Sequence, residues 1–232
     1  MSRIQQVLLL CFAVSALAAL LHWYSRHRHS RRTSLHQSSQ LPLRSVVVKS
    51  GLPDGFPTHL HEAAFWEALG RVVATFGFLE ETLGRAIFAF TATRPYAESE
   101  IADAYAKWLP TLERALYDPL GKLIGSFEQA VHAHPHATIT NLDELVTDLR
   151  RASEVRNVLC HGSWPPPAAL GRSVPFFVDT KKRIFDTPVD VAYLQQVQEH
   201  AAELACEVVN TVTHMGFQFP GSGGPGKPAW PG

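Results

Sequence analysis

The spacing of apolar residues between positions 61 and 91 most strongly limits the folds open to this chain. Eight of them recur there at intervals of three or four: Phe65, Leu69, Val72, Phe76, Leu79, Leu83, Ile87 and Phe90. This period places all eight on one face of an α-helix of about eight turns, and such a face needs a partner to cover it. Gly70, Gly77 and Gly84 recur every seven residues in the same stretch. They predict tight packing against a neighbouring helix, with close approach of a ligand as the alternative.

Similar patterns predict further helices at 97–117, 119–133, 141–161 and 189–215. We expect the first of these to bend or break near Pro110, and Pro119 to lie in the first turn of the second. Asn141, with Glu144 three residues later, predicts a capped start for the third. Gly162 is the residue expected just past its end.

Two short β-type segments, 174–178 and 183–185, are separated by the turn sequence DTKK and predict a β-hairpin. The expected fold class is therefore all-α. It is an antiparallel helical bundle of four to five helices, with a short β-hairpin before the last helix and an additional apolar helix at the N-terminus. We place the bundle at residues 58–217 and a disordered, Gly- and Pro-rich tail at 218–232.

The N-terminal segment 1–24 contains an apolar run long enough to cross a bilayer as a helix. The basic sequence RHRHSRR follows it at 26–32, which predicts a single-pass anchor in the cell membrane with the folded domain in the cytoplasm. Residues 25–57 are interpreted as a basic, flexible linker. A cleaved signal peptide and a misassigned start remain alternatives, and they would make the protein secreted or cytoplasmic.

Charge is distributed unevenly although the formal net charge is zero, with 21 basic and 21 acidic residues. Residues 1–53 hold seven of the basic residues and no acidic residue, so the other 14 basic and 21 acidic residues give the rest a net charge of −7. This excludes a domain that coats nucleic acid with a globally basic surface. The three cysteines form no CxxC pair or disulfide framework, and the sequence HAHPH at 132–136 is expected to be a surface loop; we predict no metal site and no cofactor.

One segment combines residue types suited to phosphodiester chemistry: Arg156, Asn157 and, four residues beyond Asn157, His161. A guanidinium supplies fixed positive charge for a phosphate, and an imidazole can donate or accept a proton near neutral pH. The bare spacing of Arg and His carries little information, because 15 arginines and 12 histidines in 232 residues produce it about once by chance, as at Arg31 and His36. The position at the end of a long helix, with Asn after Arg and Gly after His, carries the prediction.

With this motif the chain resembles the HEPN superfamily, a group of small all-α proteins that includes many metal-independent ribonucleases. The resemblance covers roughly residues 61–215, including Leu79 and Glu80 in the middle of the first helix. It implies that Arg156 and His161 are catalytic residues of a metal-independent endoribonuclease. Asn157, Arg151 and Glu80 are the expected substrate-binding residues, and RNA is the expected partner. The resemblance also implies a homodimer in which two motifs face one cleft.

Two other functions stay open. The same bundle can serve as a non-catalytic RNA-binding or regulatory module, for example in a toxin–antitoxin or defence system with a regulatory partner protein. It can also be a structural bundle tethered to a membrane. A purely structural explanation of the motif is that His161 interacts with the dipole at its helix C-terminus while Arg156 pairs with Glu80, Glu154 or a C-terminal carbonyl.

Overall fold

A computed structural model describes residues 45–224. The chain divides into two compact units, residues 1–52 and residues 53–232, and each is described by itself. In the first unit the described residues contain one short 3-10 helix, η2 (Lys49–Gly51). The expected apolar helix at 1–24 and the basic cluster at 26–32 lie outside the described residues. Within the part of the chain that is described, no helix is both long enough and apolar enough to cross a membrane.

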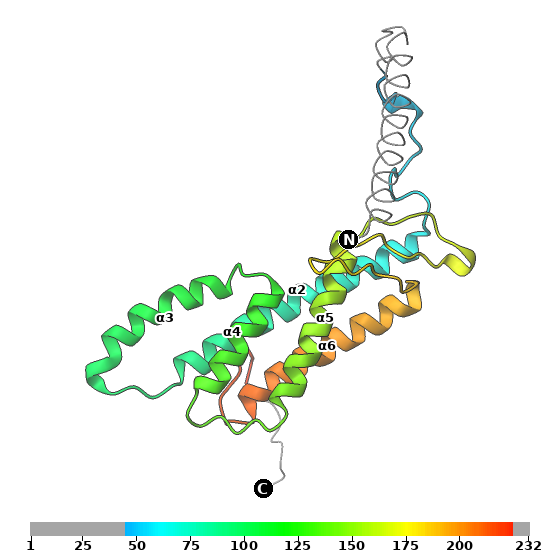
Figure 1. Cartoon of the computed structure of the whole chain (residues 1–232). Helices are drawn as coiled ribbons and strands as arrows, with labels where there is room; N and C mark the ends of the chain where they lie inside the picture. Colours follow the sequence, from blue (N-terminus) through cyan, green and yellow to red (C-terminus); the bar gives the residue numbers. More distant parts are fainter. Residues whose placement is uncertain (1–44, 225–232) are drawn as a thin grey trace, which may run out of the picture. The chain divides into compact units, whose positions relative to one another are not determined.

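The second unit is built from five α-helices: α2 (Ala63–Ala92), α3 (Ile101–Ala115), α4 (Leu120–Ala133), α5 (Leu142–His161) and α6 (Val191–Thr213). Two 3-10 helices, η3 (Glu98–Glu100) and η4 (Ala169–Gly171), lie in the connections. Consecutive helices run in alternating directions, so that α2 and α6 are parallel to each other (Figure 1). The predicted all-α helical fold is confirmed.

Helix α2 is the centre of the bundle and packs against each of the other four helices, most extensively against α6. All eight residues of its predicted apolar face are buried, and they contribute to one continuous hydrophobic core. Burying a large apolar side chain stabilises a fold by about 1.5–3 kcal/mol. The amphipathic pattern of α2 therefore accounts both for the helix and for its central position.

The prediction that three glycines mark tight helix packing is correct at only one of them. A Cβ atom added at Gly84 would lie 3.1 Å from the backbone oxygen of Ala115, where the end of α3 approaches α2. A Cβ atom added at Gly70 or Gly77 would meet no atom within 4 Å. Those two glycines leave open space beside α2.

Several helix ends differ in detail from the expectations. Helix α3 continues through Pro110 without a break. Pro119 lies one residue before α4, as its N-cap, and not in the first turn. Asn141 precedes α5, but its side chain makes no capping hydrogen bond. The side-chain cap that does form is at α6, where Asp190 accepts a hydrogen bond from the backbone N–H of Tyr193 at 2.8 Å.

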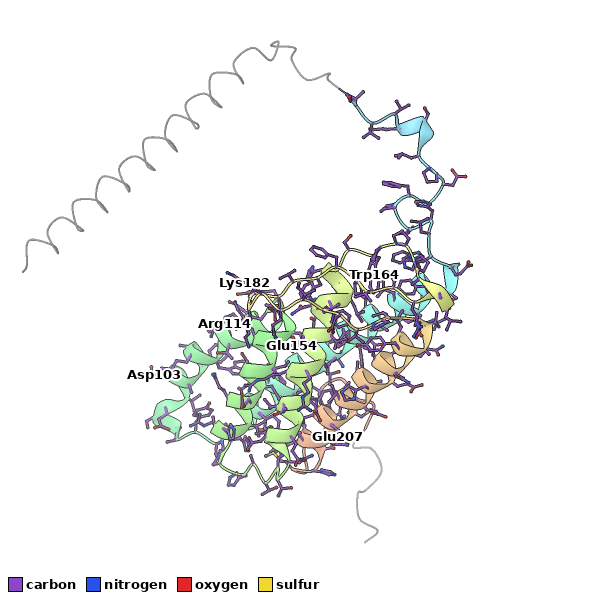
Figure 2. All side chains as sticks on the ribbon, turned by 45° about the vertical axis from the view of Figure 1, so that its right-hand side comes forward. Asp103, Arg114, Glu154, Trp164, Lys182 and Glu207 are labelled. Atoms are coloured by element: carbon purple, nitrogen blue, oxygen red, sulfur yellow. The ribbon has the colours of Figure 1, made fainter. Side chains whose placement is uncertain are left out.

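The long connection from α5 to α6 contains three isolated antiparallel bridges and no continuous strand among the described residues: Ser163–Phe176, Ser173–Val189 and Val178–Ile184. The expected hairpin is reduced to the last of these bridges. An ion pair of 2.9 Å between Arg183 and Glu154 ties the connection to α5. Figure 2 labels Glu154 on α5 and, in the connection, Trp164 and Lys182. The second residue of the expected tail, Phe219, is buried and belongs to the hydrophobic core.

Candidate functional site

Arg156 and Glu80 are brought together by the packing of α5 against α2. Their side chains form an ion pair with 3.3 Å between Nη2 of Arg156 and Oε1 of Glu80. The two side chains are 25% and 27% exposed, so the pair is only partly accessible to water. Arg156 also donates a long hydrogen bond of 3.5 Å to the side-chain oxygen of its neighbour, Asn157. Three of the predicted site residues are therefore contiguous in the structure.

The Glu80 carboxylate is incompletely satisfied. Its Oε1 atom is buried and accepts no hydrogen bond, because the guanidinium of Arg156 is close enough for an ion pair but not oriented to donate a hydrogen bond. A buried acceptor without a donor costs about 1–3 kcal/mol. Glu80 is therefore held in place by charge and packing, with hydrogen-bonding capacity left for another donor.

His161 is the last residue of α5 and is exposed. Five residues along an α-helix correspond to a rotation of about 140° and a rise of about 7.5 Å. Arg156 and His161 therefore leave the helix in different directions, and His161 does not line the cavity that Arg156 lines. Within one copy of the chain, the described structure does not bring the two predicted catalytic side chains to a common point.

The end of α5 is fixed by contact with the following connection. Gly162 has φ −68° and ψ 143°, so it is not in the left-handed conformation expected of a glycine after a helix. A Cβ atom at this position would instead lie 2.6 Å from the oxygen of Val158 and 2.9 Å from Cβ of Pro175. Glycine is required here for close packing, and this packing determines where His161 lies.

Arg151, a predicted substrate-binding residue, lies apart from the Glu80–Arg156 pair. Its side chain is exposed and pairs with Asp148 at 3.1 Å. It lines a small groove of about 200 Å³ with Phe76, Tyr193 and His200. The neighbouring Arg150 pairs with Glu128 at 2.6 Å. Arg150, Arg151 and Arg156 thus each have a carboxylate partner.

The connection from α5 to α6, which follows His161, exposes several large apolar side chains. Its exposed large apolar residues are Leu170, Val174, Phe176, Val178 and Ile184. Phe176 is 69% exposed, and its backbone pairs with Ser163, two residues after His161.

The backbone N–H of Arg183 donates to the Asp179 carboxylate and lowers its pKa below the usual range, which keeps this carboxylate ionised and the turn between 178 and 184 hydrogen-bonded.

A cavity of about 690 Å³ lies beside the Glu80–Arg156 ion pair, and it was not predicted from the sequence. Glu80 and Arg156 form part of its wall, together with residues of α2, the end of α3, the start of α4 and Pro220. The signal in the sequence was Gly77, whose missing side chain helps to leave this space open. Within residues 45–224, no group of three or more His, Cys, Asp or Glu side chains is placed to hold a metal ion.

Comparisons with models of protein families, with curated proteins and with solved structures gave no match to this chain. The functional argument therefore depends on the residues and their geometry.

Proposed function

We propose that this chain is a HEPN-like, RNA-directed protein and a metal-independent endoribonuclease that uses Arg156 and His161. The observation that carries the proposal is the arrangement at the end of α5. Arg156 is held half-buried by Glu80, and His161 is exposed at the last position of the same helix. This provides a fixed cation and an accessible proton carrier on one rigid element.

The proposed reaction needs only these groups and the substrate. The 2′-oxygen of a ribose attacks the adjacent phosphorus atom, and the bond from phosphorus to the 5′-oxygen breaks. His161 takes the proton from the 2′-hydroxyl or supplies one to the leaving 5′-oxygen, and Arg156 stabilises negative charge on the non-bridging oxygens. The products carry a 2′,3′-cyclic phosphate and a free 5′-hydroxyl, so neither a metal ion nor a cofactor is consumed.

Two copies of the chain complete the proposed site. Arg156 and His161 diverge on α5, so one phosphate can meet both only if the histidine comes from a second copy. The connection that follows α5 exposes apolar residues, Phe176 and Ile184 among them, which offer a surface for such a homodimer. A regulatory partner protein is an alternative occupant of that surface.

The test is cleavage of a mixed RNA pool by the full chain, purified in a non-ionic detergent because of its apolar N-terminal run, with EDTA present. Arg156→Ala and His161→Ala are expected to abolish cleavage. Arg150→Ala and His200→Ala remove the same residue types outside the motif and are expected to keep it. If the site is shared between copies, mixing the two inactive variants restores activity, because one site of each mixed dimer is then intact.

A non-catalytic RNA-binding or regulatory module is the second candidate, and one observation favours it. Arg150, Arg151 and Arg156 are all paired with carboxylates, so an RNA backbone has to compete with Glu128, Asp148 and Glu80. RNA binding that weakens with salt, without cleavage by the wild type, would support this candidate. If the protein neither binds nor cleaves RNA, the structural bundle tethered to a membrane is the remaining function.

The N-terminal run is proposed to anchor the protein in the cell membrane as a single span, with the folded domain in the cytoplasm. The basic sequence at 26–32 supports this orientation. Membrane fractionation with carbonate extraction, followed by protease treatment of intact cells, tests it. A protein released by carbonate, or one digested from outside, would contradict the anchor or its orientation.

A further inference from the structure

The cavity beside the Glu80–Arg156 pair is large enough to hold a small organic molecule. Its volume is about 690 Å³, within the range of sites that bind small ligands. It is bounded by the middle of α2, the end of α3 and the loop from Leu116 to Pro119, and it is closed on one side by Pro220. Gly77 lies in its wall without a side chain to fill the space.

The charged side chains around the cavity are predominantly acidic. Its ionisable wall consists of three carboxylates, Glu80, Glu81 and Asp118, and two guanidinium groups, Arg85 and Arg156. Arg85 is held by an ion pair with Glu81 and by a hydrogen bond of 3.3 Å to the backbone oxygen of Pro220. The wall itself therefore carries one net negative charge, which favours a cation over a phosphate or carboxylate; Lys122, which pairs with Asp118 at 3.8 Å, is not part of this wall.

Glu80 is one of the carboxylates of the wall whose ion pair is not also a hydrogen bond. Its buried Oε1 atom faces Arg156 at 3.3 Å but accepts no hydrogen bond. A carboxylate between two cations can be hydrogen-bonded by both, and charge-assisted bonds of this kind are stronger than neutral ones. A protonated nitrogen in the cavity would donate to the other carboxylate oxygen, Oε2, because Oε1 is buried.

The rest of the wall is suited to an apolar body. Phe88, Leu112 and Leu123 line the cavity from α2, α3 and α4. Phe88 is itself fixed by contact with Trp108, at 5.8 Å between ring centroids. A ring or a short alkyl chain can be buried on these side chains while its charged end remains near Glu80.

We propose that this cavity binds a small organic cation, a protonated amine joined to an aromatic or aliphatic body. The nitrogen donates to the Glu80 carboxylate, and the body packs on Phe88, Leu112 and Leu123. This site adjoins the proposed RNA site and shares Glu80 and Arg156 with it, but it does not include His161. Its ligand is therefore tested without RNA, so that the result does not depend on ribonuclease activity.

The experiment measures binding of three amines to the full chain in detergent by ligand-observed NMR titration: tryptamine, phenethylamine and hexylamine. Indole-3-propionate, which replaces the ammonium of tryptamine by a carboxylate, is the charge control. For ligands of this size we expect saturable binding of at least one amine in roughly the millimolar range or tighter. Indole-3-propionate is expected to bind at least about ten-fold more weakly than the amine.

Two variants on α2 locate the site. Gly77→Leu places a side chain in the cavity at a position where an added Cβ meets no atom within 4 Å, and leucine favours a helix over glycine. Gly70→Leu is the matched control, because Gly70 has the same free space one heptad earlier but does not line the cavity. We expect Gly77→Leu to weaken binding about ten-fold or more, and Gly70→Leu to leave it unchanged.

Glu80→Gln tests the charge at the proposed contact and is expected to weaken binding about ten-fold, with folding checked by circular dichroism. The proposal is overturned if none of the three amines binds saturably, or if indole-3-propionate binds as tightly as tryptamine. Equal loss of binding in Gly77→Leu and Gly70→Leu would also overturn it, since it would place the ligand elsewhere.

Discussion

Arg156 and Glu80 pair across the bundle, with 3.3 Å between Nη2 and Oε1, although their helices are separated in the chain by α3 and α4. The pair links the segment of α5 that carries the Arg156–His161 motif to the central helix α2. Its two side chains are only about one quarter exposed. The same contact therefore orients the arginine proposed to bind phosphate and forms one wall of the cavity.

The first prediction concerns the strength of this pair. Glu80→Gln and Arg156→Gln each remove one charge, and the double variant removes both. A partly exposed ion pair without a hydrogen bond is expected to contribute a coupling energy of about 0.5–1 kcal/mol. Urea denaturation of the wild type and the three variants gives this coupling. A value of zero would contradict the role of Glu80 in holding Arg156.

The second prediction concerns Gly162, which follows His161. A Cβ atom there lies 2.6 Å from the oxygen of Val158, so Gly162→Ala is expected to lower the free energy of unfolding by about 1–3 kcal/mol. Gly125→Ala in α4 is the control, because an added Cβ meets nothing within 4 Å and alanine favours a helix by up to about 1 kcal/mol. The midpoint temperature of thermal unfolding should fall for Gly162→Ala and rise for Gly125→Ala. Equal stability of both would contradict the packing argument.

The third prediction is a pH dependence of stability that arises from His61. This residue is buried, its ring stacks on Phe65 at 4.5 Å between centroids, and its Nε2 atom has no partner. Burial lowers the pKa of His61 below the usual 6.5. Between that lowered pKa and about 6.5 the unfolded chain binds more protons, so stability rises with pH in this window. The contribution is complete above about pH 6.5 and is lost as the pH falls through the folded-state pKa.

Denaturant unfolding of the wild type and of His61→Phe at a series of pH values measures this effect. The phenylalanine keeps an aromatic ring beside Phe65 but cannot be protonated, so the variant should show a smaller rise in stability between acidic pH and about 6.5. The same substitution at the exposed His59 controls for the loss of a histidine in this segment. If the free energy of unfolding changes with pH equally in the wild type and in His61→Phe, the effect does not arise from His61.

The helices could be predicted from the sequence because their signal is local. The three- and four-residue spacing of the apolar residues from Phe65 to Phe90 is a property of one helix face, and all eight of these residues are buried. Helix ends were less predictable, because several side chains can cap the same end. Asp190 directly precedes the apolar pattern of α6, and its side chain caps that helix. Asn141 is also a residue type that commonly caps helices, but its side chain makes no capping hydrogen bond to α5.

The candidate site was only partly predictable, since it depends on contacts between helices distant in the chain. Glu80 was one of three partners considered for Arg156, and only the packing of α5 on α2 selects it. The role of Gly162 depends on Pro175, whose position follows from the irregular path of the connection. Gly77 and Gly84 both line the cavity, but only Gly84 faces a close neighbour, and the identical heptad spacing of the two glycines does not reveal this difference.

The last prediction concerns α3, which is attached to the bundle more weakly than the other helices. It contains no buried residue, and it packs mainly against α2 and the short η3. One hydrogen bond of 2.8 Å, from Nε1 of Trp108 to the Thr91 hydroxyl, fixes its middle. Segments with few buried contacts open more readily than the global fold. Hydrogen exchange followed by mass spectrometry should therefore show faster exchange at 101–115 than in α2 or α5.

Trp108→Phe removes this hydrogen bond and is expected to accelerate exchange in α3 several-fold, while exchange in α5 stays unchanged. Trp66→Phe is the matched control. It also removes an indole hydrogen bond, from Nε1 to the Thr58 oxygen at 2.8 Å, but at the start of α2. Because the end of α3 forms part of the cavity wall, Trp108→Phe should also weaken amine binding there, whereas Trp66→Phe should not. Exchange in α3 as slow as in α2 would contradict its weak attachment, and unchanged exchange in Trp108→Phe would show that Trp108 is not its main attachment.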